Sequence, residues 1–355
     1  MSDLDSPQTN STYNVSEEIT TLIRGFFSTP VLAGIGRLGA SEIMLRLREF
    51  SPDDFVQIPN KQLLVAALDY LTRIALLDKV DERKHTYCTT ELGRHIFQRL
   101  GSFLTPHSYH EYLYHFDEQL LQAGPYHKQE VDRLENILGS GRAHDRYFPP
   151  AVTFLRRKVR FRVIADIGCG DGRFLDCVLR GVPDVSVVGM DVSEVSIHTA
   201  REKLTHRHPS RALTTFLADG AKINEWSGRL LQIARSDELV ISMWFLLHEI
   251  CCGDPIKAQQ FLSSVHELFP QTPLIACELV RQTPALLSRY RKQSIMPEYV
   301  FFHDLSEQGI LSWSQYQTIL KKIPYTLAME RLYDQIGTVP CEKEPAVFVW
   351  CLLPK

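Results

Sequence analysis

The sequence predicts an α/β fold: a doubly wound, mostly parallel sheet that follows a mainly helical N-terminal module. Three observations predict it. From Phe161 onward, short apolar runs that are typical of buried strands alternate with segments of helical length. The chain then ends in two more strand-like runs, "YTLAMERLYD" and "AVFVWCLL", which predict an antiparallel hairpin. Before residue 150 the apolar spacing is instead helical.

The chain of 355 residues, 44% of them hydrophobic, is long enough for two domains with a buried core. We expect a disordered tail over residues 1–15 and a winged-helix-like dimerisation domain over residues 16–105. A helical connector that can cover a neighbouring site is expected over 106–150, and the ligand-binding α/β domain over 151–355.

The winged-helix expectation rests on a helix from Lys61 to Leu77, two short strands around the charged turn 81–84, and a helix that Thr90 caps. Such a module can bind DNA, and a regulator that binds DNA is therefore one alternative. The Lys61–Leu77 segment, however, carries only Lys61 and Arg73 as cations, and the formal net charge of the chain is −3. We therefore expect a homodimer formed through this module and no nucleic-acid partner.

The polar, acidic N-terminus has neither the basic nor the apolar region of a signal peptide, and we identify no apolar run of membrane-spanning length. A cytoplasmic protein without a membrane partner is expected. The eight cysteines show no Cys-x-x-Cys spacing, so the sequence indicates neither a disulfide framework nor a zinc ribbon.

One glycine-rich segment, "VIADIGCGDGRFL", follows a predicted strand and leads into a predicted helix. Glycine lets the chain turn sharply and lets backbone N–H groups approach a ligand at the carboxyl edge of the sheet. An acidic residue ends the next strand, in "VVGMDVS", where it can accept hydrogen bonds from a ribose. The glycines follow G-x-G-x-G rather than the G-x-G-x-x-G of dinucleotide oxidoreductases.

The pattern resembles class I S-adenosylmethionine-dependent methyltransferases. The resemblance implies S-adenosyl-L-methionine as cofactor, with the glycine loop on its methionine and ribose, the second-strand acid on the ribose hydroxyls and an acid after the third strand on the adenine amino group. The corresponding cofactor-binding residues are Asp166, Gly168, Gly170, Gly172, Asp191 and Asp219.

Two histidines are candidates for the chemistry. His248, in "WFLLHEICC", ends the fourth apolar run, at the carboxyl edge beside the glycine loop. It can cap the strand, act as a general base or bind a metal. His303, in "VFFHDLSEQG", lies beyond the fifth strand on a segment expected to return over the same edge. Two neutral imidazoles form an open ligand set that suits iron and related first-row ions.

The segments "WFLLHEI" and "EYVFFHDLSEQGILSWSQYQTIL", together with "DRYFPPAV" and the winged-helix start, resemble the metal-dependent α-keto acid C-methyltransferases. That resemblance implies that His248 and His303 bind one iron ion and that a chelated 2-oxo acid is methylated at C3, as in the biosynthesis of β-methyl amino acids for secondary metabolites. His248, Glu249 and His303 would be the catalytic residues. Glu249 stands where one member of that family has Asp, and the connector diverges.

Substrate contacts are expected from the connector. Arg133, Arg142 and Arg146 are candidates for the carboxylate of the substrate, although Arg146 can instead bridge the two domains. Tyr114 belongs to an aromatic run that can exclude water. Asp304 can support the metal site.

Two further interpretations remain open at this stage. A metal-free small-molecule O-methyltransferase would use His248 as the general base and would not need His303. A cofactor-binding regulator would use the winged helix on DNA, which the apolar Lys61–Leu77 segment argues against.

Overall fold

The computed structural model describes residues 15–121, 131–290, 294–306, 308–334 and 344–355; the tail expected over residues 1–15 lies outside this part except for its last residue. The chain forms two compact units that divide between His107 and Ser108. Each unit has its own hydrophobic core.

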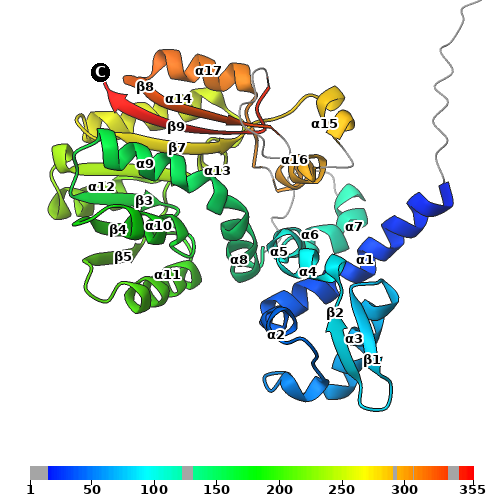
Figure 1. Cartoon of the computed structure of the whole chain (residues 1–355). Helices are drawn as coiled ribbons and strands as arrows, with labels where there is room; N and C mark the ends of the chain where they lie inside the picture. The colour runs from blue at the N-terminus through cyan, green and yellow to red at the C-terminus, as the bar shows by residue number, and fades with distance from the viewer. Residues whose placement is uncertain (1–14, 122–130, 291–293, 307, 335–343) are drawn as a thin grey trace, which may run out of the picture. The chain divides into compact units, whose positions relative to one another are not determined.

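The first unit is mainly helical. Its elements, in chain order, are α1 (Val15–Arg37), α2 (Ala40–Arg46), η1 (Pro52–Asp54), α3 (Lys61–Arg73), β1 (Leu77–Asp81), β2 (Thr86–Thr89), α4 (Glu91–Phe97) and α5 (Gly101–His107) (Figure 1). Strands β1 and β2 pair antiparallel around the expected turn, and the Thr90 hydroxyl accepts a hydrogen bond from the Gly93 N–H at 2.9 Å. The expected end of α3 at Leu77 is wrong: the helix ends at Arg73, since Ala75 has a positive φ of 61° and Leu77 already pairs in β1.

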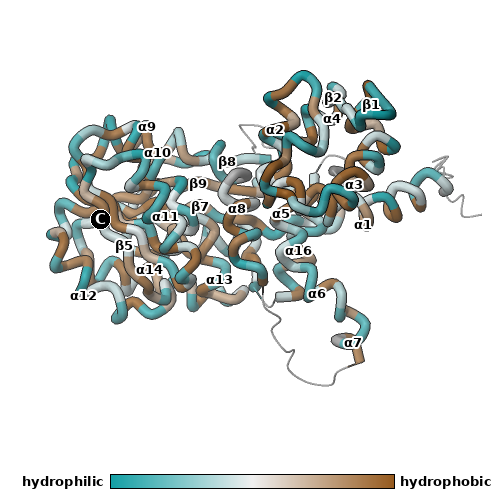
Figure 2. Tube along the Cα trace, turned by 90° about the horizontal axis from the view of Figure 1, so that it is seen from below, coloured by the Kyte–Doolittle hydropathy of each residue, from teal (hydrophilic) through white to brown (hydrophobic). Residues whose placement is uncertain are grey.

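Helix α1 exposes a row of large apolar side chains. They are Ile19, Leu22, Ile23, Phe26 and Phe27, with Leu22 and Phe26 74% and 77% exposed. By length and composition residues 16–37 qualify as a membrane-spanning helix, which corrects the expectation from the sequence on this point. Figure 2 shows the alternation of apolar and polar segments along this helix. Apolar surface of this kind is typical of an interface with a protein or a membrane.

The second unit contains the remaining elements. They are α6 (His110–Tyr114), α7 (Phe116–Leu121), α8 (Arg133–His144), η2 (Asp145–Tyr147), α9 (Phe148–Lys158), β3 (Val163–Ile167), α10 (Arg173–Gly181), β4 (Ser186–Asp191), α11 (Glu194–Arg207), β5 (Leu213–Leu217), α12 (Ile223–Ile233), η3 (Ser236–Glu238), β6 (Leu239–Trp244), α13 (Leu247–Cys251), α14 (Pro255–Leu268), β7 (Leu274–Leu279), α15 (Pro284–Tyr290), α16 (Met296–Leu305), α17 (Trp313–Lys322), β8 (Tyr325–Tyr333) and β9 (Val347–Pro354).

A seven-stranded sheet organises this unit, in the order β5-β4-β3-β6-β7-β9-β8. Strands β3 to β7 pair in parallel, whereas β9 is antiparallel to both β7 and β8. The predicted fold class, including the terminal antiparallel hairpin, is therefore confirmed. Because the parallel strands share one direction, the loops that leave β3, β4, β5, β6 and β7 all gather at one edge of the sheet.

Helices cover both faces of the sheet (Figure 1). In β3, Val163, Ala165 and Ile167 pack with residues of α12, α14 and α17 on one face. Ile164 lies on the other face, where α9, α10 and α11 form a second buried cluster. Successive side chains of β3 point to opposite faces of the sheet, and both faces are buried. The strand is therefore a continuous apolar run in the sequence.

Candidate active site

The glycine loop between β3 and α10 needs its glycines for conformation and for space. Gly168, Gly170 and Gly172 have positive φ of 72°, 52° and 73°, a region that side chains disfavour. A Cβ on Gly172 would lie 3.0 Å from the Leu204 side chain, and one on Gly168 would lie 3.2 Å from Leu246. The loop therefore packs closely between α11 and the segment that leaves β6.

Asp191, at the end of β4, fixes the loop through its carboxylate. One oxygen accepts a hydrogen bond from the Gly170 N–H at 3.0 Å, and the other accepts one from the Ser193 N–H at 2.9 Å. A carboxylate has about four acceptor positions. Asp191 therefore keeps acceptor capacity for a further donor while it holds the loop in place.

A second carboxylate, Asp171, anchors the same loop from inside. It is 5% exposed, and its Oδ2 accepts hydrogen bonds from Arg173 Nε and Lys203 Nζ, both at 2.9 Å. Because the cations come from α10 and α11, the loop is tied to both helices that flank it. This role of Asp171 was not predicted from the sequence.

The other two predicted acids lie in different surroundings. Asp166 is 2% exposed and accepts a hydrogen bond from the Ser242 hydroxyl at 2.7 Å, across the β3–β6 pair. Burial raises the pKa of Asp166 to about 8, so this carboxyl is largely protonated at neutral pH. Asp219 follows β5, is partly exposed, and accepts a hydrogen bond from the Ala221 N–H at 3.0 Å. It therefore remains accessible at the same edge as the loop.

The chain leaves β6 through a strained residue. Phe245 has a positive φ of 54°, uncommon for a bulky side chain, and its N–H bonds the Cys277 carbonyl oxygen at 2.8 Å. The ring of Phe245 stacks on His144, with 3.8 Å between centroids. This turn starts the short helix α13 directly at the edge of the sheet, and His248 lies in its first turn.

His248 is buried and forms a dyad with Glu278 of β7. The imidazole Nδ1 lies 2.8 Å from Glu278 Oε1, and the backbone N–H of His248 donates to Oε2 at 2.7 Å. Since a carboxylate can only accept, Nδ1 carries the hydrogen and Nε2 of the neutral ring carries the lone pair. Burial by itself lowers the pKa of His248, but the Glu278 carboxylate outweighs it, so the pKa is raised.

His303 lies on α16, and its ring is likewise held through Nδ1. It is 6% exposed, and its Nδ1 donates to the Tyr299 carbonyl oxygen at 2.5 Å, which again leaves the lone pair on Nε2. Burial lowers the pKa of His303 to about 3, with the nearby His248 as the next cause. This ring is therefore neutral at ordinary pH.

The two rings lie against each other, with 4.8 Å between their centroids and 67° between their planes. His303 was expected to return over the edge that carries His248, and the structure places it there. Within the described part of the chain, neither histidine belongs to a group of three potential metal-ligand side chains. The protein thus supplies two imidazole nitrogens and no third close ligand from those residues.

Close backbone packing holds the His303 segment beside α13. Gly309, which follows α16, approaches Gly253 so closely that a Cβ on Gly309 would lie 2.4 Å from the Gly253 Cα. Arg281, just beyond β7, donates to the Ile310 carbonyl oxygen at 3.3 Å and forms an ion pair with Asp304. Asp304 thus anchors α16, whereas it was expected to support a metal.

Tyr109 and Glu249 extend the site. The Tyr109 ring is 8% exposed and stacks on Phe302, with 5.2 Å between centroids. Burial first, and the Glu249 carboxylate next, raise the pKa of Tyr109. Tyr109, from the connector, therefore lies within electrostatic reach of the acid that follows His248.

The structure does not bring the predicted substrate residues to the histidines as a group. Arg133 is exposed at the start of α8, close enough to act electrostatically on Tyr109. Arg146 donates to the hydroxyl of its neighbour Tyr147 at 2.6 Å, and Tyr114 is 80% exposed with its ring edge-on to His115. The side chain of Arg142 lies outside the described residues.

Sequence reasoning missed Glu278 and Tyr299, which fix the two histidine rings. A signal for Glu278 exists, because it is a single acid within the apolar run "LIACEL". A carboxylate that is fully buried needs a partner. No side-chain signal exists for Tyr299, since it contributes a backbone carbonyl.

Comparison with known proteins identifies a domain within the α/β unit and solved structures with the same fold. Residues 165–269 match the family model described as "Methyltransferase domain". Solved structures with the same fold include the mitomycin 7-O-methyltransferase MmcR, at 15% identity and a TM-score of 0.55 over 96% of this chain and 98% of that chain. Human N-acetylserotonin methyltransferase in complex with SAM has 12% identity and a TM-score of 0.61, over 98% of this chain and 99% of that chain. CalO1, a methyltransferase in calicheamicin biosynthesis in its SAH-bound form, has 13% identity and a TM-score of 0.57, over 99% of this chain and 100% of that chain. No curated protein matches the sequence significantly.

The fold is thus the two-domain fold of these methyltransferases, and the α/β unit carries the matched methyltransferase domain. The protein is an S-adenosylmethionine-dependent methyltransferase.

Proposed function

We propose that this enzyme transfers the methyl group of S-adenosylmethionine to a hydroxyl oxygen of a small molecule, with His248 as the general base. One observation carries the proposal: Glu278 holds His248 Nδ1 at 2.8 Å and so leaves the lone pair on Nε2 of a buried ring that follows β6, at the carboxyl edge of the parallel strands. The metal-free alternative from the sequence thus becomes the leading proposal.

The reaction needs one proton acceptor. The acceptor oxygen attacks the sulfonium methyl carbon, the carbon–sulfur bond breaks to give S-adenosylhomocysteine, and the hydroxyl proton moves to His248 Nε2. A positioned base contributes about 10²- to 10⁴-fold to such a step. The Glu278 carboxylate stabilises the imidazolium that forms, because an opposite charge in a buried site acts strongly.

For the cofactor, we propose that Asp191 accepts the ribose hydroxyls and that Asp219 accepts the adenine amino group. Gly168, Gly170 and Gly172 would lie against the methionine and ribose portion. Support comes from the free acceptor capacity of Asp191 and from the position of both acids at the edge where the loop ends. Asp166 would act indirectly, since its carboxyl bonds Ser242.

The relatives in structure support oxygen as the acceptor. One is described as a 7-O-methyltransferase acting on mitomycin, and another as belonging to calicheamicin biosynthesis. A hydroxylated secondary metabolite is therefore the substrate class that we propose. At 15% identity or less these structures share the fold with this chain, and the acceptor remains our inference.

A second candidate function follows from the His248–His303 pair. Both rings are anchored through Nδ1, and a donor set of two imidazole nitrogens fits an iron ion whose other positions are filled by substrate and water. A metal held there would polarise a bound 2-oxo acid and acidify its C3–H. In that case His248 and His303 would hold the ion, and Glu249, the next residue after His248, would accept the proton. The enzyme would then be a C-methyltransferase.

Two other predictions from the sequence stay predictions. The exposed apolar side chains of α1 support a homodimer formed through the N-terminal unit. The α3 helix, with Lys61 and Arg73 as its cations, continues to argue against DNA binding.

The test is to incubate the enzyme with S-adenosylmethionine and matched panels of phenols and 2-oxo acids, and to measure S-adenosylhomocysteine release. NMR of the products then locates the new methyl group. We expect an O-methyl signal from a phenol, and loss of the reaction in His248→Ala. Methylation at C3 of a 2-oxo acid, with none of the phenols accepted, would replace the leading proposal by the second candidate.

A further inference from the structure

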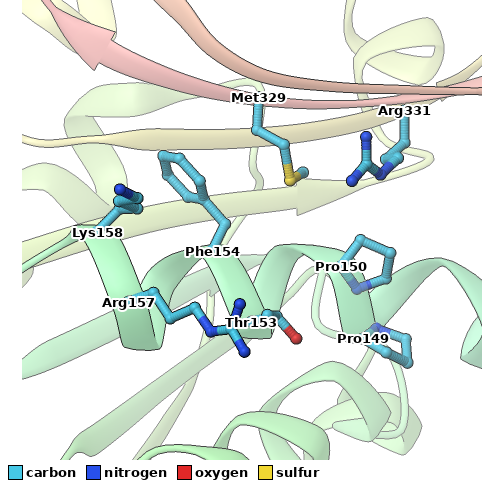
Figure 3. Close-up of a pocket in the computed structure, with 8 residues that line it drawn as sticks. All are labelled: Pro149, Pro150, Thr153, Phe154, Arg157, Lys158, Met329 and Arg331. Carbon is cyan, nitrogen blue, oxygen red and sulfur yellow. The ribbon is translucent and has the colours of Figure 1, made fainter.

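A groove that the proposed reaction does not use lies between helix α9 and the edge strand β8. Its volume is about 440 Å³, within the range of small-molecule sites, and eight residues line it: Pro149, Pro150, Thr153, Phe154, Arg157, Lys158, Met329 and Arg331. Figure 3 shows Met329 and Arg331 extending from the strand toward the helix, while Phe154 points up from α9 toward Met329. His248, Glu278 and His303 belong to other elements.

The groove has an apolar floor and a cationic rim. Phe154 and Met329 are half-buried and pack against the core beneath. Arg157 and Lys158, in the last turn of α9, and Arg331, on β8, supply positive charge from both walls. Within the described part of the chain none of these three cations forms an ion pair; Arg331 donates to the Glu330 carbonyl oxygen at 3.3 Å.

The helix dipole accounts for the cations on only one wall of the groove, the wall formed by α9. Cations in the last turn of α9 interact favourably with the negative end of the helix dipole. That effect places no demand on β8, from which Arg331 approaches the same groove. Cations on both walls of a groove with an aromatic and thioether floor match a ligand with an apolar body and an anionic head, since guanidinium groups bind carboxylate and phosphate in a forked geometry.

We propose that this groove binds a small amphipathic organic anion, a flat apolar body that carries a carboxylate or phosphate, at a site separate from the methyl-transfer centre. The apolar body lies on Phe154 and Met329. Arg157, Lys158 and Arg331 bind the anionic head.

The test uses three naphthalene probes with the same apolar body: 2-naphthoate, 2-naphthyl phosphate and the neutral 2-naphthamide. Binding to the full-length protein is measured by calorimetry with saturating S-adenosylhomocysteine, which occupies the cofactor site. We expect at least one anionic probe to bind with a Kd of about a millimolar or lower, and about tenfold more tightly than the amide. The better of the two anions identifies carboxylate or phosphate as the head.

Two double variants distinguish a specific binding site from nonspecific attraction of anions to positive surface charge. Arg157→Gln/Arg331→Gln removes one rim cation from each wall, and Arg156→Gln/Arg160→Gln removes the same charge from exposed neighbours that do not line the groove. The first pair should weaken anion binding about tenfold or more, and the second should leave it within about twofold. Equal losses in both pairs, equal affinity for the amide, or no binding of either anion overturns the proposal.

Discussion

The proposed cofactor edge and the proposed acceptor side of the site are built in different ways. At the cofactor edge the backbone forms the site: glycines with positive φ make the loop, and the Gly170 N–H bonds Asp191 at 3.0 Å. On the acceptor side, side chains from α13, β7 and α16 meet, with His248 held by Glu278 and placed against His303. Changes in the loop should therefore affect cofactor affinity, and changes on the acceptor side should affect turnover.

Loss of the proposed base should have the greatest effect and should separate these two functions. His248→Ala should lower kcat by about 10²- to 10⁴-fold, because the hydroxyl proton then has no positioned acceptor. The affinity for S-adenosylhomocysteine, measured by calorimetry, should stay within about twofold, since the glycine loop does not depend on the imidazole. A parallel loss of affinity and turnover would show that the two sides are not separable.

The second-largest effect is expected from a substitution in the glycine loop between β3 and α10. Gly172→Ala places a Cβ at a φ of 73°, where it would lie 3.0 Å from Leu204. The left-handed region costs a residue with a Cβ ~1–2 kcal/mol, so the affinity for S-adenosylhomocysteine should fall about tenfold.

A matched control exists for that substitution. Gly228 lies in α12 and is exposed, and a Cβ added to it would have no heavy atom within 4 Å. Gly228→Ala should leave cofactor affinity unchanged and stabilise the helix by ~0.5–1 kcal/mol. Equal affinities of Gly172→Ala and Gly228→Ala for the cofactor would contradict the role of the loop.

Removing the Glu278 charge tests how the base is tuned. The carboxylate raises the pKa of His248 against the opposing effect of burial, so Glu278→Gln should lower that pKa. Because the base must be unprotonated, the acidic limb of the kcat/KM profile should move to lower pH, while the plateau falls about tenfold or more. An unmoved limb would mean that another group titrates.

A weaker effect concerns stability. His303 has a folded pKa of about 3, below its unfolded value, so in acid the unfolded chain binds a proton that the native chain does not. The contribution of neutral His303 to the free energy of unfolding is fully present above pH 6.5. It falls by up to about 1.4 kcal/mol per pH unit as the pH drops toward 3.

Urea unfolding with a chelator present, at several pH values, measures this slope. His303→Gln has no such titration, and its stability should depend less on pH between 6.5 and 4 than that of the wild type. Parallel profiles would show that His303 is not buried in neutral form.

The contrast between the two sides also explains what the sequence could predict. The glycine loop and Asp191 form a local strand–loop–helix pattern, and period and spacing suffice to place them. Glu278 was missed because its role depends on the β6–β7 pairing, which brings β7 beside the exit of β6. The end of α3 was placed too late because the apolar spacing of the helix continues into β1. The exposed face of α1 was missed because composition does not tell which side a neighbour covers.

The decisive measurement is turnover of an accepted phenol before and after exhaustive chelation, with elemental analysis of the same samples. We predict that metal-free enzyme keeps its full activity and that His248→Ala loses it. Loss of activity on chelation, with recovery on adding iron and with the metal absent from His303→Ala, would contradict a metal-free base and establish the histidine pair as a metal site.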